Sequence, residues 1–188
     1  HKPAVVSIAA GIPLIALENW LGDNTAIIRA MPNTPAMVLC GATGLFANAQ
    51  VSTAQQTLVE KIFMAVGYAC WVDNEAQIDA VIAVSGSGPA YFFRIMEIMQ
   101  QVGQELGLSE QIAGDLTLKT ALGAARMAAQ SNTNPSQLRE QVTSPGGTTQ
   151  AALQTFADQG LEDTFRKAMN SALTRAEQMS TDFGSATK

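Results

Sequence analysis

Residues 26–35, Ala-Ile-Ile-Arg-Ala-Met-Pro-Asn-Thr-Pro, decide the expected fold of the first part of the chain. An almost continuous apolar run is typical of a strand buried on both faces of a sheet. Pro32 ends that strand, and Pro32 and Pro35 stiffen the loop that follows. Ligands bind at the carboxyl ends of strands in open α/β sheets. Asn33 and Thr34 are therefore candidate hydrogen-bonding groups, with a turn or helix cap made by Asn33 as the alternative.

Strand and helix patterns alternate on both sides of this stretch. Strands are expected at 4–9, 44–47 and 69–72, and helices at 14–21 and from Thr53, which can act as an N-cap. The apolar side of that second helix is expected to consist of Leu58, Val59, Ile62, Phe63 and Val66. Strands that alternate with helices predict an α/β fold, and this part looks like the later portion of a nucleotide-binding domain.

After Asp73 and Asn74 the strand patterns cease. Helices are expected at 75–84 and 90–106, then after Ser109, after Asn134, from the glycines at 146–147, and around 165–176. We expect two domains, an α/β part over residues 1–73 and an all-helical part over residues 74–188.

Composition narrows the possible partners. Charged residues make up 14% of the chain, against about 25% in ordinary soluble domains, so we expect much of the surface to be covered by another copy. The net charge is −5 and the basic residues are scattered, which argues against nucleic acid as a partner. No apolar run reaches membrane-spanning length and no secretory signal is evident, so we expect a cytoplasmic protein in which Cys40 and Cys70 are free thiols.

The residue inventory excludes several kinds of catalysis. His1 is the single histidine, so serine and cysteine nucleophiles have no histidine base. The two cysteines lie far apart in the sequence, and zinc sites usually need histidine or clustered cysteine, so no metal is expected. No segment sets two carboxylates together as an acid and base pair. The chemistry is therefore expected to rely on backbone amides, hydroxyl groups and a bound cofactor.

A second candidate segment is Val84-Ser-Gly-Ser-Gly-Pro-Ala-Tyr91. Its glycines free the backbone, and Pro89 is typical of a first helical turn, where unpaired N–H groups attract a polar ligand. The segment is not a dinucleotide fingerprint, because no clear strand precedes it. A plain joint between two helices is the alternative.

A third candidate segment is Thr143-Ser-Pro-Gly-Gly-Thr-Thr149, which also opens a helix. Consecutive glycines allow a concave group of amides, and two hydroxyls add donors, a combination that suits a small carboxylate. The segment contains no lysine, which argues against a phosphate-binding P-loop. The alternative is simple helix capping by Thr148 or Thr149.

The blocks MPNTPA, SGSGPAY and SPGGTTQAAL, in this order and spacing, resemble the pyrroline-5-carboxylate reductase family over essentially the whole chain. The resemblance implies a Rossmann domain followed by a helical domain that forms a homodimer, or a higher homo-oligomer. It implies reduction of Δ1-pyrroline-5-carboxylate to L-proline, the last step of proline biosynthesis, with hydride from NADPH or NADH.

The same resemblance assigns roles to particular residues. The substrate carboxylate is expected to bind Ser144, Gly146, Gly147 and Thr148. Thr149 is expected to lie near the imine nitrogen as the catalytic group. The cofactor's nicotinamide is expected to contact Met31, Pro32, Asn33, Ser85 and Gly86.

The sequence departs from the family pattern at its start. Family members begin with a strand, a glycine-rich turn and a helix that receive the pyrophosphate, whereas this sequence opens on what looks like a later strand. We therefore expect a truncated Rossmann domain, and little or no activity for the chain as given.

Two alternatives stay open. One is an oxidoreductase of the 3-hydroxyacid dehydrogenase type, for which Lys119 is the one candidate catalytic lysine and the SPGGTT block has no role. The other is a dimerisation core with no catalytic activity.

Overall fold

The computed structural model describes residues 3–185. His1, the histidine on which the exclusion of histidine catalysis depends, lies outside the described residues. The chain divides into two compact units. Unit 1 contains the chain up to Pro89 together with the stretch from Lys167 onward, and unit 2 contains Ala90–Arg166. All the strands found in the described residues belong to unit 1.

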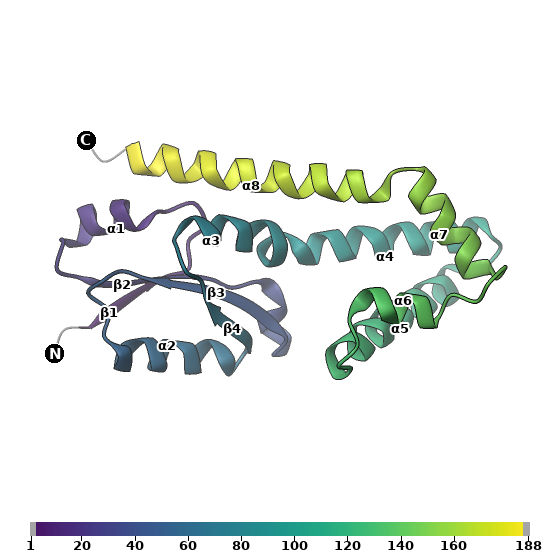
Figure 1. Ribbon diagram of the computed structural model, residues 1–188, viewed down its shortest axis with the longest axis horizontal. Coiled ribbons are helices and arrows are strands. Elements are labelled where there is room, and N and C mark those ends of the chain that lie inside the picture. The colour runs from purple at the N-terminus through teal and green to yellow at the C-terminus, as the bar shows by residue number, and fades with distance from the viewer. Residues whose placement is uncertain (1–2, 186–188) are drawn as a thin grey trace. The chain divides into compact units, whose positions relative to one another are not determined.

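Unit 1 is built on a four-stranded mixed sheet in the order β1-β2-β3-β4 (Figure 1). The strands are β1 (Ala4–Ser7), β2 (Ala26–Met31), β3 (Gly41–Ala47) and β4 (Gly67–Trp71). β1 and β2 are parallel, β2 and β3 antiparallel, and β3 and β4 parallel. The four predicted strands are confirmed, although the first ends at Ser7 rather than residue 9 and the third begins earlier, at Gly41.

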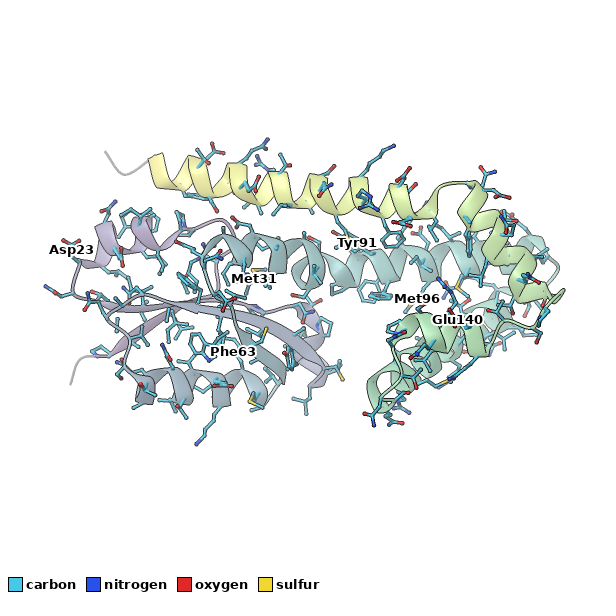
Figure 2. All side chains as sticks on the ribbon, viewed as in Figure 1. Asp23, Met31, Phe63, Tyr91, Met96 and Glu140 are labelled. Carbon is cyan, nitrogen blue, oxygen red and sulfur yellow. The ribbon has the colours of Figure 1, made fainter. Side chains whose placement is uncertain are left out.

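Helices cover both faces of this sheet, as Figure 1 shows for α1 (Leu14–Leu21) and α2 (Thr53–Met64). Successive residues of β2 point to opposite faces, so Ile28 packs in the cluster on the α2 side and Ile27 in the cluster on the α1 side. Both side chains are fully buried. Phe63 lies between α2 and the sheet in Figure 2. The predicted α/β layering of the first part is therefore confirmed.

Two details of α2 differ from the sequence-based expectation. Its N-cap is Ser52, not Thr53: the Ser52 hydroxyl accepts from the Gln55 N–H, and the Gln55 side chain accepts from the Ser52 N–H. This reciprocal arrangement satisfies two amides at once. The expected apolar side was also too wide, because Leu58 and Ile62 are more than half exposed while Val59 is buried against the sheet.

The strands are followed by helices alone in the described chain. These are α3 (Ala76–Val81), the π-helix η2 (Ile82–Gly86), α4 (Gly88–Glu105), α5 (Glu110–Gln130), α6 (Pro135–Gln141), α7 (Thr148–Asp158) and α8 (Leu161–Ser185). As predicted, α5 and α6 begin after Ser109 and Asn134, and both residues cap their helices through their side chains. Between residues 3 and 185, no helix has the length and apolar character that a membrane span requires.

A buried charge cluster lies on the α1 side of the sheet. Arg29, in β2, is 3% exposed, and its Nη1 lies 2.6 Å from Glu75 Oε1, just before α3. The same Glu75 oxygen accepts from the Leu14 N–H at 2.6 Å, at the start of α1. Burial raises the pKa of the Asp79 carboxyl, an effect that the charge of Arg29 opposes and the charges of Glu177 and Glu75 reinforce.

Removing the carboxylate of Glu75 should destabilise unit 1 strongly. The Glu75→Ala variant leaves the Arg29 guanidinium buried without its partner, so we expect a loss of about 3 kcal/mol in the free energy of unfolding, measured by urea denaturation. Glu162→Ala is the control, because Glu162 pairs with Arg166 on the surface and its removal should cost about 0.5 kcal/mol or less. Equal losses in the two variants would contradict this interpretation.

Asp79→Asn should stabilise the fold at neutral pH. A raised folded-state pKa means that the carboxyl binds its proton more tightly in the folded state, so its contribution to stability is favourable at low pH and is lost as the pH rises through that pKa. Asparagine does not ionise, so the gain should grow between about pH 4 and pH 7 in urea denaturation. A variant less stable than its parent at pH 7 would show that attraction to Arg29 outweighs burial.

Candidate active site

The loop after β2 lies beside the helical segment that follows α3, within unit 1. The Asn33 Nδ2 donates to the Ser85 carbonyl at 3.0 Å, and its Oδ1 accepts from the Ala42 N–H at 2.8 Å. A Cβ on Gly86 would lie 3.1 Å from the Met31 Cε. Figure 2 shows Met31 on the α3 side of the sheet. The tertiary structure thus brings together the two segments predicted to border a cofactor, which lie 52 residues apart in the sequence.

The Asn33 side chain does not serve as a helix cap, which was the alternative expectation. Asn33 precedes the short 3-10 helix η1 (Thr34–Val38), yet its side chain makes no capping bond there. Both of its polar atoms are engaged outside η1, by β3 and by η2. The side chain therefore connects elements that are distant in the sequence.

The expected interruption of the helix at residues 85–88 is much shorter in the structure. The π-helix η2 runs to Gly86, Ser87 alone lies outside a helix although it keeps helical dihedral angles, and α4 starts at Gly88, so that Pro89 lies in a first helical turn as predicted. The Ser87 N–H donates to the Ile82 carbonyl at 2.8 Å, five residues earlier. That amide is consequently not available to a ligand. The structure shows the helix-to-helix joint, and π-helical turns of this kind are frequent at functional sites.

A tight turn precedes α7 in unit 2. The Gly147 N–H donates to the Ser144 carbonyl at 3.0 Å, which closes a four-residue turn with Pro145 second and Gly146 third. Gly146 has a φ of 71°, as the third residue of a type II turn requires, and a residue with a Cβ is strained there. The predicted glycine-dependent loop is therefore present, in the form of this turn.

The first turn of α7 leaves amides exposed. Gly147 is the N-cap and makes no side-chain cap, so neither Thr148 nor Thr149 caps the helix. Within residues 3–185 no hydrogen bond is found for the N–H groups of Thr148 and Thr149, and both residues are exposed. The Gly146 N–H, by contrast, donates to Gln150 Oε1 at 2.6 Å. Free amides at a helix start carry partial positive charge and bind anions.

A groove of about 810 Å³ lies next to this turn, inside unit 2. Thr143 and Gln150 line it, but none of the residues predicted to bind substrate does. The charged residues that line it are Arg139, Glu140, Glu162 and Asp163, which make it acidic on balance. An acidic groove repels a carboxylate, so the groove does not provide the carboxylate site expected at the adjacent turn.

Two residues of the candidate site were missed by sequence reasoning. Gln150 accepts the Gly146 amide, and it stands three residues after the N-cap, where glutamine commonly reaches back to the helix start. That spacing was a usable signal. Ala42 contributes its backbone N–H to Asn33, and no local pattern marks such a contact. Lys119, the candidate of the alternative enzyme class, lies exposed on α5.

Comparisons with known proteins point to the same family as the three sequence blocks. The family model described as pyrroline-5-carboxylate reductase dimerisation matches residues 75–179. The pyrroline-5-carboxylate reductase of Pseudomonas aeruginosa is 53% identical over 180 residues, which cover 96% of this chain and 66% of that protein. The chain thus spans just under two thirds of the length of this relative, and 65% of the Vibrio alginolyticus enzyme, to which it is 44% identical.

Solved structures show the same likeness. A pyrroline-5-carboxylate reductase from Coxiella burnetii is 48% identical with a TM-score of 0.92, over 96% of this chain and 67% of that one. The Plasmodium falciparum enzyme, solved with NADP bound, is 29% identical with a TM-score of 0.87, over 94% of this chain and 67% of that one. These likenesses confirm the predicted fold class, a Rossmann-type α/β part followed by helices, and the chain belongs to the pyrroline-5-carboxylate reductase family.

Proposed function

We propose that the protein reduces Δ1-pyrroline-5-carboxylate to L-proline, with NADPH or NADH as the hydride donor. The observation that carries the proposal is the pairing of the Met31–Asn33 loop with Ser85 and Gly86 in a member of this family. The NADP bound to the Plasmodium falciparum relative supports a nicotinamide cofactor. When bound, the cofactor supplies the hydride, and the protein must orient two small molecules.

Met31, Pro32, Asn33, Ser85 and Gly86 are proposed to border the nicotinamide. The loop leaves the carboxyl end of β2, where open α/β sheets bind ligands, and Pro32 restricts its backbone. Gly86 allows the π-helix to approach Met31 closely, since any Cβ there would already contact the Met31 side chain. These features support a rigid wall against which a flat ring can lie.

The turn before α7 is proposed to hold the substrate carboxylate. The Thr148 and Thr149 amides have no hydrogen-bond partner among the described residues, which suits a carboxylate, whereas the Gly146 and Gly147 amides are already bonded to Gln150 and Ser144. We therefore assign the main carboxylate contacts to the two threonine amides. Ser144, Gly146 and Gly147 are proposed to shape the turn, with the Ser144 hydroxyl as a further donor.

Thr149 is proposed as the catalytic residue. Hydride adds to the imine carbon, the C=N double bond becomes a single bond, and the ring nitrogen keeps the proton that made the imine electrophilic. A hydroxyl beside that nitrogen can hold the proton in place or deliver it. Thr149 carries an exposed hydroxyl next to the proposed carboxylate contacts, which supports this role.

A homodimer is proposed as the working form. Within the described residues of unit 2, Ala113 is the single buried hydrophobic residue. Large apolar side chains on its helices are exposed instead, among them Phe92, Phe93, Met99, Ile112, Leu116 and Met127. Exposed apolar area of this extent marks an interaction surface, and the family model that matches is one of dimerisation. The same observation supports the alternative of a non-catalytic dimerisation core, which a reductase assay decides.

The boundary between the two domains after Asp73 is also part of the proposal. The family model begins at Glu75, which supports a nucleotide-binding part over residues 1–73 and a helical part over residues 74–188. A cytoplasmic location is proposed on the ground that Cys40 and Cys70 are both free thiols, as is usual in a reducing compartment.

Thr149→Val should separate proton handling from binding. The change keeps the size of the side chain and the amide but removes the hydroxyl, so we expect kcat to fall about 100-fold with little change in KM, measured by oxidation of NADPH that depends on pyrroline-5-carboxylate. Thr155→Val, on the same helix, is the control and should leave both constants unchanged. An unchanged kcat removes Thr149 from the reaction. Because the chain as given is expected to have little or no activity, these assays use a protein of the relatives' full length that contains this chain, and an unsubstituted protein of that length without reductase activity refutes the proposed function.

A charge on α5 should break the dimer. Leu116, 55% exposed in the single chain, is expected to lie in the interface, so Leu116→Glu should weaken dimerisation about 30-fold or more in sedimentation experiments. Leu58→Glu, on α2, places the same charge at a leucine that is 60% exposed and should leave the dimer intact. A well-folded monomer at micromolar concentration before any substitution would contradict the proposed assembly.

A further inference from the structure

We propose that Asn33 is a positioning residue whose side-chain amide clamps the loop after β2 to the π-helix η2. The clamp holds the two walls of the proposed nicotinamide site at a fixed separation. The inference rests on the proposed function, because the group to be positioned is the nicotinamide ring. It gives Asn33 a role through its neighbours, rather than through a side-chain contact with the cofactor.

The chemistry of its two partners determines how the Asn33 amide points. The backbone N–H of Ala42 can only donate, so the atom 2.8 Å from it is the carbonyl Oδ1. The carbonyl of Ser85 can only accept, so the atom 3.0 Å from it is Nδ2. A carboxylate at this position would place an oxygen against the Ser85 oxygen, and an apolar side chain would satisfy neither partner.

Pro89 explains why the Ser85 carbonyl is available to this clamp. In a regular helix that carbonyl would accept from the N–H of the residue four positions later, which here is Pro89, and proline has no N–H. The Asn33 Nδ2 is the side-chain donor that the structure places there. The π-helix and Pro89 thus leave the Ser85 carbonyl free to accept a hydrogen bond from a side chain of another element.

The clamp acts directly on the proposed walls of the site. Ser85 is followed by Gly86, whose backbone lies against the Met31 side chain, and Met31 precedes Asn33 by two residues. Any loosening of the Asn33–Ser85 bond therefore moves Gly86 relative to Met31. Because hydride transfer is sensitive to small displacements of the reacting groups, such a movement should slow the reaction.

Asn48 provides a matched control within the same sheet. Its Oδ1 accepts from the Ile27 N–H at 3.1 Å, and its Nδ2 donates to the Thr25 carbonyl at 2.9 Å, so it too bridges separate segments with both polar atoms. It lies at the opposite end of β2, about 20 Å away along the strand. The Asn48 Nδ2 also donates to Glu18 Oε1 at 2.9 Å, so Asn48→Asp should disturb the fold at least as much as Asn33→Asp, without disturbing the proposed site.

The first test measures hydrogen exchange of the Gly86 and Ser87 amides, which requires no cofactor. In Asn33→Asp and Asn33→Leu we expect about tenfold faster exchange at these amides, relative to amides of α2 in the same variant, because η2 loses its anchor. Asn48→Asp should leave that ratio unchanged. Unchanged exchange at Gly86 and Ser87 in both Asn33 variants overturns the clamp.

The second test compares hydride transfer with the binding of a cofactor fragment. In the Asn33 variants, made in a protein of the relatives' full length, kcat/KM for pyrroline-5-carboxylate reduction should fall about tenfold to a hundredfold, while the dissociation constant of 2′-phospho-ADP-ribose, which lacks the nicotinamide, stays unchanged. Asn48→Asp should change neither quantity. A fall in kcat/KM with unaltered exchange at Gly86 and Ser87 would mean that Asn33 contacts the ligand itself, and this overturns the positioning role.

The two proposals fail in different ways. If an unsubstituted protein of the relatives' full length shows no reduction of pyrroline-5-carboxylate, the proposed function is wrong, and the exchange measurement still decides whether Asn33 clamps η2. If the protein is an active reductase and both Asn33 variants retain full kcat/KM, the proposed function stands and the positioning role is wrong.

Discussion

A guanidinium buried in the middle of a sheet needs a carboxylate, and in this protein Arg29 of β2 meets Glu75, the residue before α3. The carboxylate also accepts the first amide of α1. One side chain thereby joins three elements that are distant in the sequence, and an unpaired charge there would cost several kcal/mol. The position of α3 relative to β2 depends on this pair. The positions of the segments that follow β2 and α3 therefore depend on it as well.

From that pair, β2 and α3 lead to the two walls of the proposed nicotinamide site. β2 continues into Met31 and the loop to Asn33, while α3 continues through the π-helix to Ser85 and Gly86. The two paths meet again where Asn33 binds the Ser85 carbonyl. The proposed site is thus bounded by an ion pair at its base, in which Arg29 is buried, and by a partly buried amide clamp at its rim, so that its geometry is set by polar groups partly shielded from solvent.

The helices of unit 2 are stabilised in a different way. Side chains cap α5 and α6, yet the described helices of unit 2 bury almost no apolar side chains within the single chain. Helices of this kind gain most of their stability from packing, so the exposed apolar faces require a partner. The turn at Ser144–Gly147 is by contrast local, since Pro145 and Gly146 alone supply the backbone angles that a type II turn requires.

The sequence by itself determined the elements whose signals are local: the strand at 26–31, the helix at 14–21, the helix start after Asn134, and the three blocks that indicate the family. Neighbouring residues carry those signals, so no tertiary information was needed. Only the tertiary structure decided that Leu58 and Ile62 face outward and that Asn33 binds Ser85. Both outcomes depend on the position of a different element, the sheet for the two α2 residues and η2 for Asn33, and spacing along the chain does not show which group of another element a side chain will meet.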